Sequence, residues 1–188
     1  FHLVDDNPVA KMFWGRVTIY SAAAYYSFNK GGKVQHLIHQ LKYKKQQEVG
    51  RVVGKLYGSD LQKSNLFNTV NCIVPVPLHA KKKKQRGYNQ SELFARGLSE
   101  SMKVDVNTNA LYRVFETETQ TKKSRFKRWE NVASIFLLQN EHVLAGKHIL
   151  LVDDVVTTGA TLEACAQTLL KIPDVKISIA ALAYATNL

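Results

Sequence analysis

The sequence predicts an α/β fold in which a mostly parallel sheet is flanked by helices. Residues 147–154 read KHILLVDD, a continuous apolar strand of the kind found in parallel sheets that are covered on both faces. Along the chain, segments with strand character alternate with segments whose apolar residues recur at helical spacing. Strands that alternate with helices form β-α-β units, and the strands of such units run parallel.

The individual elements follow from local patterns in chain order. Residues 17–28 are rich in aromatic and β-branched side chains and predict a strand or a hairpin, and residues 71–77 predict a short buried strand that ends at prolines and leads into a loop. Further strands are expected at residues 110–114, 134–138, 147–154 and 175–185. Helices are expected from apolar spacing at residues 34–41, 46–61, from residue 89 or 91 to about 102, and at 160–171.

The 188 residues fit a single domain, within which residues 1–45 are a candidate amino-terminal appendage. No apolar run is long enough to span a membrane, and the start of the chain lacks the pattern of a signal peptide, so we expect a cytoplasmic protein. Cys72 and Cys165 are far apart in apolar surroundings, which favours buried free thiols over a disulfide or a zinc site.

The charge of the chain is strongly basic. Lys and Arg number 26 against 15 Asp and Glu, which gives a formal net charge of +11. The excess is concentrated at residues 30–55, 81–86 and 122–128. A solvated surface explains any one such run, but together they point to a polyanionic partner or substrate.

The stretch ILLVDDVVTTGAT, residues 149–161, has the pattern of a phosphate-binding turn. The N–H groups at the start of a helix attract an anion, and Gly159 lets the backbone approach it closely. Hydroxyl donors surround this glycine at Thr157, Thr158 and Thr161. The alternative is a plain strand-to-helix turn whose polar residues only cap the helix.

Asp153 and Asp154 indicate a different partner, because carboxylates repel phosphate. They accept hydrogen bonds from sugar hydroxyls or hold a divalent cation through water. Phosphate on one side and a diol on the other describe a ribose 5-phosphate. The stretch closely resembles the phosphoribosyl pyrophosphate motif of type I phosphoribosyltransferases, in which the loop Thr157, Thr158, Gly159, Ala160 and Thr161 would bind the donor, and the resemblance implies that fold with a flexible hood loop.

A second motif, VPVPLHAKKKKQRGYNQSE at residues 74–92, follows an earlier strand with cations and a glycine. Arg86, Gly87, Asn89 and Gln90 offer a cation, close backbone approach and amide donors for a pyrophosphate. A solubilising loop is the alternative. PVPLH followed by RGYNQSELFARGL is similar to the signature of the ComF family of amidophosphoribosyltransferase-like competence proteins.

A third stretch, TETQTKKSRFKRWENVASIF at residues 117–136, fits the same family pattern. The resemblance implies a hood that closes over the donor, in which Lys122, Arg125 and Arg128 would act as catalytic cations that neutralise charge on the departing pyrophosphate. An exposed basic loop is the alternative. Many ComF proteins carry an amino-terminal zinc ribbon with two cysteine pairs. This sequence has no CxxC pair, so the resemblance does not imply a zinc site in it.

Two functions follow from these motifs. The first is a phosphoribosyltransferase that binds phosphoribosyl pyrophosphate with Mg²⁺, held through Asp153, Asp154 and water without a direct protein ligand, and that transfers phosphoribose to an unknown acceptor. The second is an accessory protein of natural transformation and DNA uptake that keeps the fold without turnover and contacts single-stranded or double-stranded DNA through its basic runs.

Overall fold

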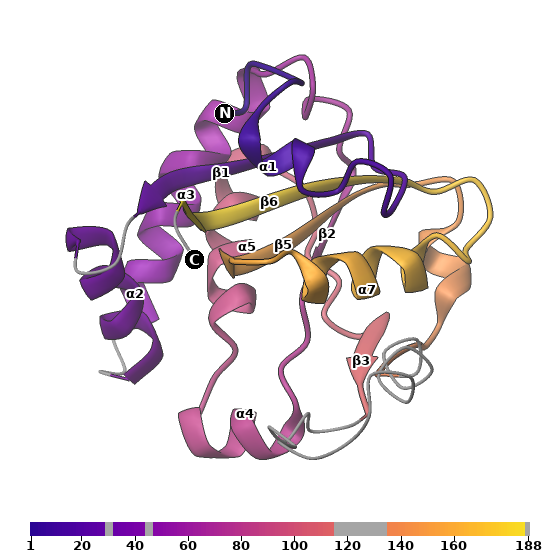
Figure 1. Ribbon diagram of the computed structural model, residues 1–188. Coiled ribbons are helices and arrows are strands. Elements are labelled where there is room, and N and C mark those ends of the chain that lie inside the picture. Colours follow the sequence, from indigo (N-terminus) through magenta and orange to yellow (C-terminus); the bar gives the residue numbers. More distant parts are fainter. Residues whose placement is uncertain (29–31, 44–46, 115–134, 187–188) are drawn as a thin grey trace, which may run out of the picture.

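The computed structural model describes residues 1–28, 32–43, 47–114 and 135–186. Its strands are β1 (Ser21–Phe28), β2 (Cys72–Pro75), β3 (Leu111–Arg113), β4 (Phe136–Leu138), β5 (His148–Val156) and β6 (Lys176–Ala185) (Figure 1). Its helices are α1 (Pro8–Lys11), α2 (Lys33–Tyr43), α3 (Gln47–Lys63), α4 (Ala80–Arg86), α5 (Gln90–Met102), α7 (Ala160–Leu169) and the short 3-10 helix η1 (Glu141–Leu144). None of these described helices is both long and apolar enough to cross a membrane.

The main sheet has the strand order β1-β6-β5-β2, and every neighbouring pair in it is parallel. Val74 of β2 lies beside Leu151 of β5, and Leu151 lies beside Ile179 of β6. The predicted fold class, a mostly parallel sheet flanked by helices, is therefore confirmed. Strands β3 and β4 form a second, antiparallel pair.

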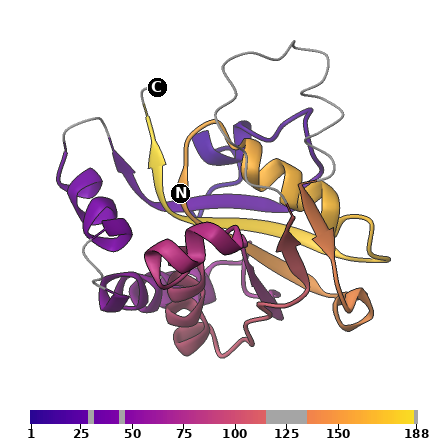
Figure 2. The same cartoon turned by 90° about the horizontal axis from the view of Figure 1, so that it is seen from below.

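Helices cover both faces of the main sheet (Figure 2). Ile149 and Leu151 of β5 belong to the buried cluster that includes residues of α1 and α7. Leu150 and Val152 belong to the cluster that includes residues of α3 and α5. Successive side chains of a strand point to opposite faces, and here both faces are buried, which explains the continuous apolar run in the sequence.

Helices α3 and α5 pack with their backbones in contact because glycines lie between them. A Cβ atom on Gly97 would lie 2.1 Å from the Arg51 carbonyl oxygen, and one on Gly54 would lie 2.3 Å from the Phe94 carbonyl oxygen. Backbone atoms cannot swing aside as side chains do, so this approach requires glycine at both positions. The contact fixes where α5 begins relative to the sheet.

Two segments differ from the sequence prediction in the kind of element that they form. Residues 17–20 are not part of a strand, and β1 is a single strand rather than a hairpin because its hydrogen-bonded partner is the distant strand β6. The loop predicted after β2 contains helix α4. His79 caps its start, with Nδ1 accepting from the Lys81 N–H over 3.3 Å, and Gly87 ends it at φ +84°.

The cysteines are buried free thiols, as the sequence predicts. Burial raises the pKa of Cys72, and burial together with the nearby Asp153 carboxylate raises the pKa of Cys165. Both thiols therefore stay protonated at neutral pH, which argues against a thiolate nucleophile at either position.

A buried polar network joins three strands at the amino end of the sheet. His148 of β5 is 5% exposed. Its Nδ1 lies 2.7 Å from Thr69 Oγ1 and its Nε2 lies 2.8 Å from Ser178 Oγ of β6, which in turn lies 2.8 Å from Ser21 Oγ of β1. Burial, followed by the Lys176 ammonium, lowers the pKa of His148 to about 4. The imidazole is therefore neutral in the folded protein at neutral pH.

Substituting Gly97→Ala should lower the free energy of unfolding by about 2 kcal/mol or more, because the new methyl group forces α3 and α5 apart. Denaturant unfolding followed by circular dichroism measures this. Gly50→Ala is a matched control, since its Cβ would meet Leu41 Cδ1 at 3.1 Å and Leu93 Cβ at 3.3 Å but no backbone atom closer than 3.7 Å. Equal losses for the two variants would contradict the packing account.

The stability of the protein should fall as the pH is lowered from about 6.5 to about 4. The unfolded chain binds a proton at the ordinary histidine pKa of 6.5, whereas folded His148 does not until about pH 4, so its contribution is complete above 6.5 and is lost on acidification. Denaturant unfolding across this range measures the slope. His148→Gln should reduce the slope of the free energy of unfolding against pH, and the exposed His142→Gln serves as the control variant. Identical slopes for the native chain and His148→Gln would be inconsistent with a lowered pKa of His148.

Candidate functional site

Two of the sequence motifs meet at the carboxyl edge of the main sheet. Strand β5 ends at Val156, and residues 157–159 lead into α7. The end of β2 lies beside it, where the Val76 N–H donates to the Val152 carbonyl over 2.8 Å. In the first turn of α5, the Ser91 hydroxyl donates to Asp153 Oδ1 over 2.7 Å. Segments distant in sequence therefore form one site at the edge where parallel sheets bind ligands.

The turn between β5 and α7 presents donors at the surface. Gly159 is the N-cap of α7 and has φ +76°, a conformation that side chains disfavour. Thr157, Thr158, Ala160 and Thr161 are exposed. The first N–H groups of a helix lack partners within the helix and carry partial positive charge, so this turn has the features of an anion-binding loop.

Asp153 and Asp154 are held inside strand β5, which continues to Val156, two residues beyond its predicted end. Asp153 is half-buried, and its Oδ1 accepts from the Asp154 N–H over 2.8 Å as well as from Ser91. Asp154 is 8% exposed. Pairing with β6 extends past both residues, with Val155 beside Ala183. The regular backbone of the strand thus fixes the positions from which both side chains extend.

The second motif follows β2 as α4 and the start of α5. Arg86 Nη1 donates to Gln90 Oε1 over 3.0 Å, and Gly87 separates the two helices. Asn89 caps α5 through Oδ1, and its Nδ2 donates to the Val76 carbonyl over 2.9 Å. Gln90 is 2% exposed, and no described residue pairs with its Nε2. Asn89 therefore links α5 to the end of β2. Its predicted role, donating a hydrogen bond to a pyrophosphate, stays a prediction.

Lys122, Arg125 and Arg128 lie outside the described residues, within segment 115–134. On either side of that segment the chain is paired, because β3 and β4 are antiparallel neighbours and the Val114 N–H donates to the Ile135 carbonyl over 2.9 Å. The catalytic role assigned to the three cations stays a prediction.

Two residues of the site were not predicted from the sequence. Ser91 was recognised only as a possible helix start, yet its hydroxyl reaches Asp153. Arg16 Nη1 donates to the Thr158 carbonyl over 3.0 Å, across 142 positions of the chain, and its Nη2 pairs with Glu163. A local pattern signals neither contact, since both depend on how the sheet brings distant segments together.

The two carboxylates at the sheet edge are candidates for holding a cation whose remaining ligands come from a substrate and from water. Among the described residues, no group of three or more His, Cys, Asp and Glu side chains is arranged to hold a metal ion. Mg²⁺ commonly takes one or two carboxylates, keeps several waters and completes its shell with substrate phosphates. Asp153 and Asp154 supply two carboxylates, and their role in holding Mg²⁺ stays a prediction.

Comparison with known proteins identifies relatives. The profile of the phosphoribosyl transferase domain family matches residues 65–187. The DNA utilization protein YhgH of Escherichia coli K12 is 34% identical over 138 residues, which are 72% of this chain and 60% of that protein. Competence protein F of Haemophilus influenzae is 31% identical over 153 residues, which are 79% of this chain and 67% of that protein. The chain thus spans about 60% of the length of the first of these relatives.

Among solved structures, the glutamine phosphoribosylpyrophosphate amidotransferase from B. subtilis is 17% identical, with a TM-score of 0.49 over 75% of this chain and 30% of that one, which is a distant likeness in fold. The family profile covers most of the chain, including β2, β5 and both motifs that meet at the sheet edge. The chain therefore belongs to the phosphoribosyl transferase domain family, and its similarity to a competence protein confirms the resemblance to the ComF family.

Proposed function

We propose that this protein is a phosphoribosyltransferase that binds phosphoribosyl pyrophosphate with Mg²⁺ and transfers its phosphoribosyl group to an acceptor. The observation that carries the proposal is the 2.7 Å hydrogen bond from Ser91 to Asp153, which joins the two motifs at the sheet edge. The donor has a phosphate at one end and a pyrophosphate on its anomeric carbon. Its site therefore needs two anion-binding regions on either side of a sugar.

The turn at residues 157–161 would hold the 5′-phosphate. Exposed Thr157, Thr158 and Thr161 offer hydroxyls, and the amino end of α7 offers N–H groups and a favourable dipole. Asp153 and Asp154 would accept hydrogen bonds from the ribose hydroxyls, since a carboxylate offers only acceptor atoms and a hydroxyl can donate to it. Their fixed position in β5 would orient the ring relative to the phosphate.

Arg86 and the backbone around Gly87 would bind the pyrophosphate beyond the other end of the sugar. In the reaction, the bond from the anomeric carbon to pyrophosphate breaks, its electron pair leaves with the pyrophosphate, and the acceptor nucleophile bonds to the carbon. Mg²⁺ held through Asp153, Asp154 and water would supply charge stabilisation to the leaving group. Lys122, Arg125 and Arg128 would add to that stabilisation, so the protein acts mainly by positioning and electrostatics.

Replacing both acids, Asp153→Asn with Asp154→Asn, should abolish binding of phosphoribosyl pyrophosphate, because the amides neither hold the cation nor accept as many hydrogen bonds. Calorimetry in the presence of Mg²⁺ measures this, and release of pyrophosphate that depends on an added acceptor measures turnover. Exposed Asp105→Asn with Asp174→Asn controls for the loss of two charges. Unchanged affinity in the double variant would refute the proposed site.

A second candidate, DNA binding without turnover, is favoured by the exposed basic helix α4 and by the names of the relatives. Helix α4 carries Lys81–Lys84, of which Lys81, Lys83 and Lys84 are exposed. Such a surface would contact the phosphate backbone without reading bases.

If DNA binds through α4, the affinity for a single-stranded oligonucleotide should fall steeply with added salt, because released counterions drive the association. Fluorescence anisotropy at increasing salt measures the slope. Lys83→Gln with Lys84→Gln should make the slope shallower, whereas exposed Lys171→Gln with Lys103→Gln should not. Binding that is absent, or equally salt-sensitive in all variants, would exclude this surface.

A further inference from the structure

We propose that Arg16 is a positioning residue for the turn at residues 157–161. The inference rests on the proposed function, because it concerns the turn that would hold the 5′-phosphate. Arg16 lies outside residues 65–187, the part of the chain that the family profile matches. The amino-terminal segment would therefore contribute to a site whose other residues lie within the family domain.

The guanidinium of Arg16 joins three parts of the chain. Its Nη1 donates to the Met12 carbonyl over 2.9 Å and to the Thr158 carbonyl over 3.0 Å, and its Nη2 pairs with Glu163 in the first turn of α7. A carbonyl that accepts from Arg16 is not turned toward a bound anion. This contact therefore favours the backbone orientation in which the N–H groups of the turn serve the phosphate.

The Phe13 ring supports the same turn from behind. Phe13 is fully buried, and a Cβ atom on Gly159 would lie 3.2 Å from its Cε1. The ring thus lies where a side chain at Gly159 would project, beside the residue whose φ of +76° shapes the turn. Phe13 and Arg16 come from one short segment after α1, so they brace Gly159 and Thr158 together.

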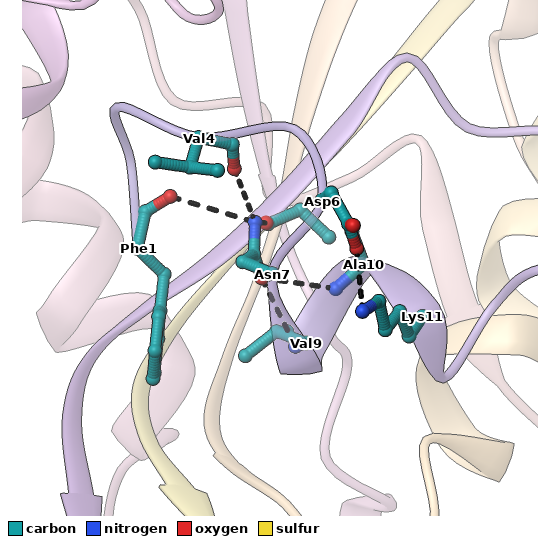
Figure 3. Close-up of polar contacts among 8 residues, drawn as sticks. Phe1, Val4, Asp6, Asn7, Val9, Ala10 and Lys11 are labelled. Atoms are coloured by element: carbon teal, nitrogen blue, oxygen red, sulfur yellow. Dashed lines mark hydrogen bonds and ion pairs between the residues drawn. The ribbon is translucent and has the colours of Figure 1, made fainter.

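Asn7 precedes α1 and holds the start of this helix (Figure 3). The residue is 3% exposed, and its Oδ1 accepts from the Val9 and Ala10 N–H groups over 3.0 and 3.1 Å at the start of α1. Its Nδ2 donates to the Val4 carbonyl over 2.7 Å and to the Ala22 carbonyl of β1 over 2.8 Å. Helix α1 is thereby fixed to β1, and Phe13 and Arg16 lie in the turn that directly follows this helix.

Arg16 also neutralises a charge that would oppose phosphate binding. Glu163 lies in the first turn of α7, at the helix end that would face the anion. An unpaired carboxylate there would repel phosphate, and its ion pair with Arg16 offsets the repulsion. The pair is partly exposed, so its own contribution to folding is small, and its effect is expected mainly on ligand affinity.

Calorimetry with two separate ligands tests the inference. Arg16→Met should weaken the binding of ribose 5-phosphate roughly tenfold, the size expected for losing hydrogen bonds from a charged donor. It should leave the binding of Mg²⁺-pyrophosphate unchanged, because that ligand occupies the Arg86 region. Lys11→Met is the matched control, since it removes a cation of α1 whose partners are Asp6 and Trp14, and it should change neither affinity.

A second substitution separates positioning from general stability. Glu163→Gln added to Arg16→Met should recover part of the lost affinity, because the unpaired carboxylate is gone. Thermal unfolding reports whether each variant is folded; if Arg16→Met is not, Arg16→Lys, which keeps the charge but not the paired donors, should bind ribose 5-phosphate with intermediate affinity. Native affinity for ribose 5-phosphate in the folded Arg16 variant, or an equal loss for both ligands, would overturn the inference alone. A native chain that binds neither ligand would overturn the proposed function and, with it, this inference.

Discussion

The parallel pairing of β2 with β5 is the constraint on which the candidate site depends. Pro75 lies beside Val152, so both strands end at the same edge of the sheet. The close contact of α3 with α5, which requires Gly54 and Gly97, then sets the start of α5 against that edge. Strand register and helix packing together bring Ser91 to Asp153. A change in either would separate the motifs without altering a residue of the site.

Polar residues lie at both ends of strand β5. Their surroundings show which of them serve the fold and which are available to a ligand. At the amino end, His148 is enclosed and both its ring nitrogens have hydroxyl partners, so burial keeps it neutral and it serves the fold. At the carboxyl end, Thr157 and Thr158 are exposed beside two acids. Polar groups that the protein does not bury at a sheet edge are available to a ligand.

The sequence predicted what local patterns determine. The apolar run of β5, the helical spacing in α2, α3 and α7, and the glycine turn at 159 all follow from residue type and period, and each is present in the structure. Helix α4 was missed because a run of lysines reads as a solvated loop, although lysine is a good helix former and Gly87 is a typical helix end. Arg16 and Ser91 were missed because their partners are distant in the sequence. The spacing of residues within a local motif does not indicate such tertiary contacts.

The central claim is that one donor molecule binds to both motifs at once. A titration of backbone amide signals by NMR with phosphoribosyl pyrophosphate and Mg²⁺ tests it directly. The account predicts that amides of residues 157–161 and of residues 86–91 shift together and reach saturation with a single dissociation constant. Shifts confined to one motif, or two motifs that saturate at different concentrations, would contradict it.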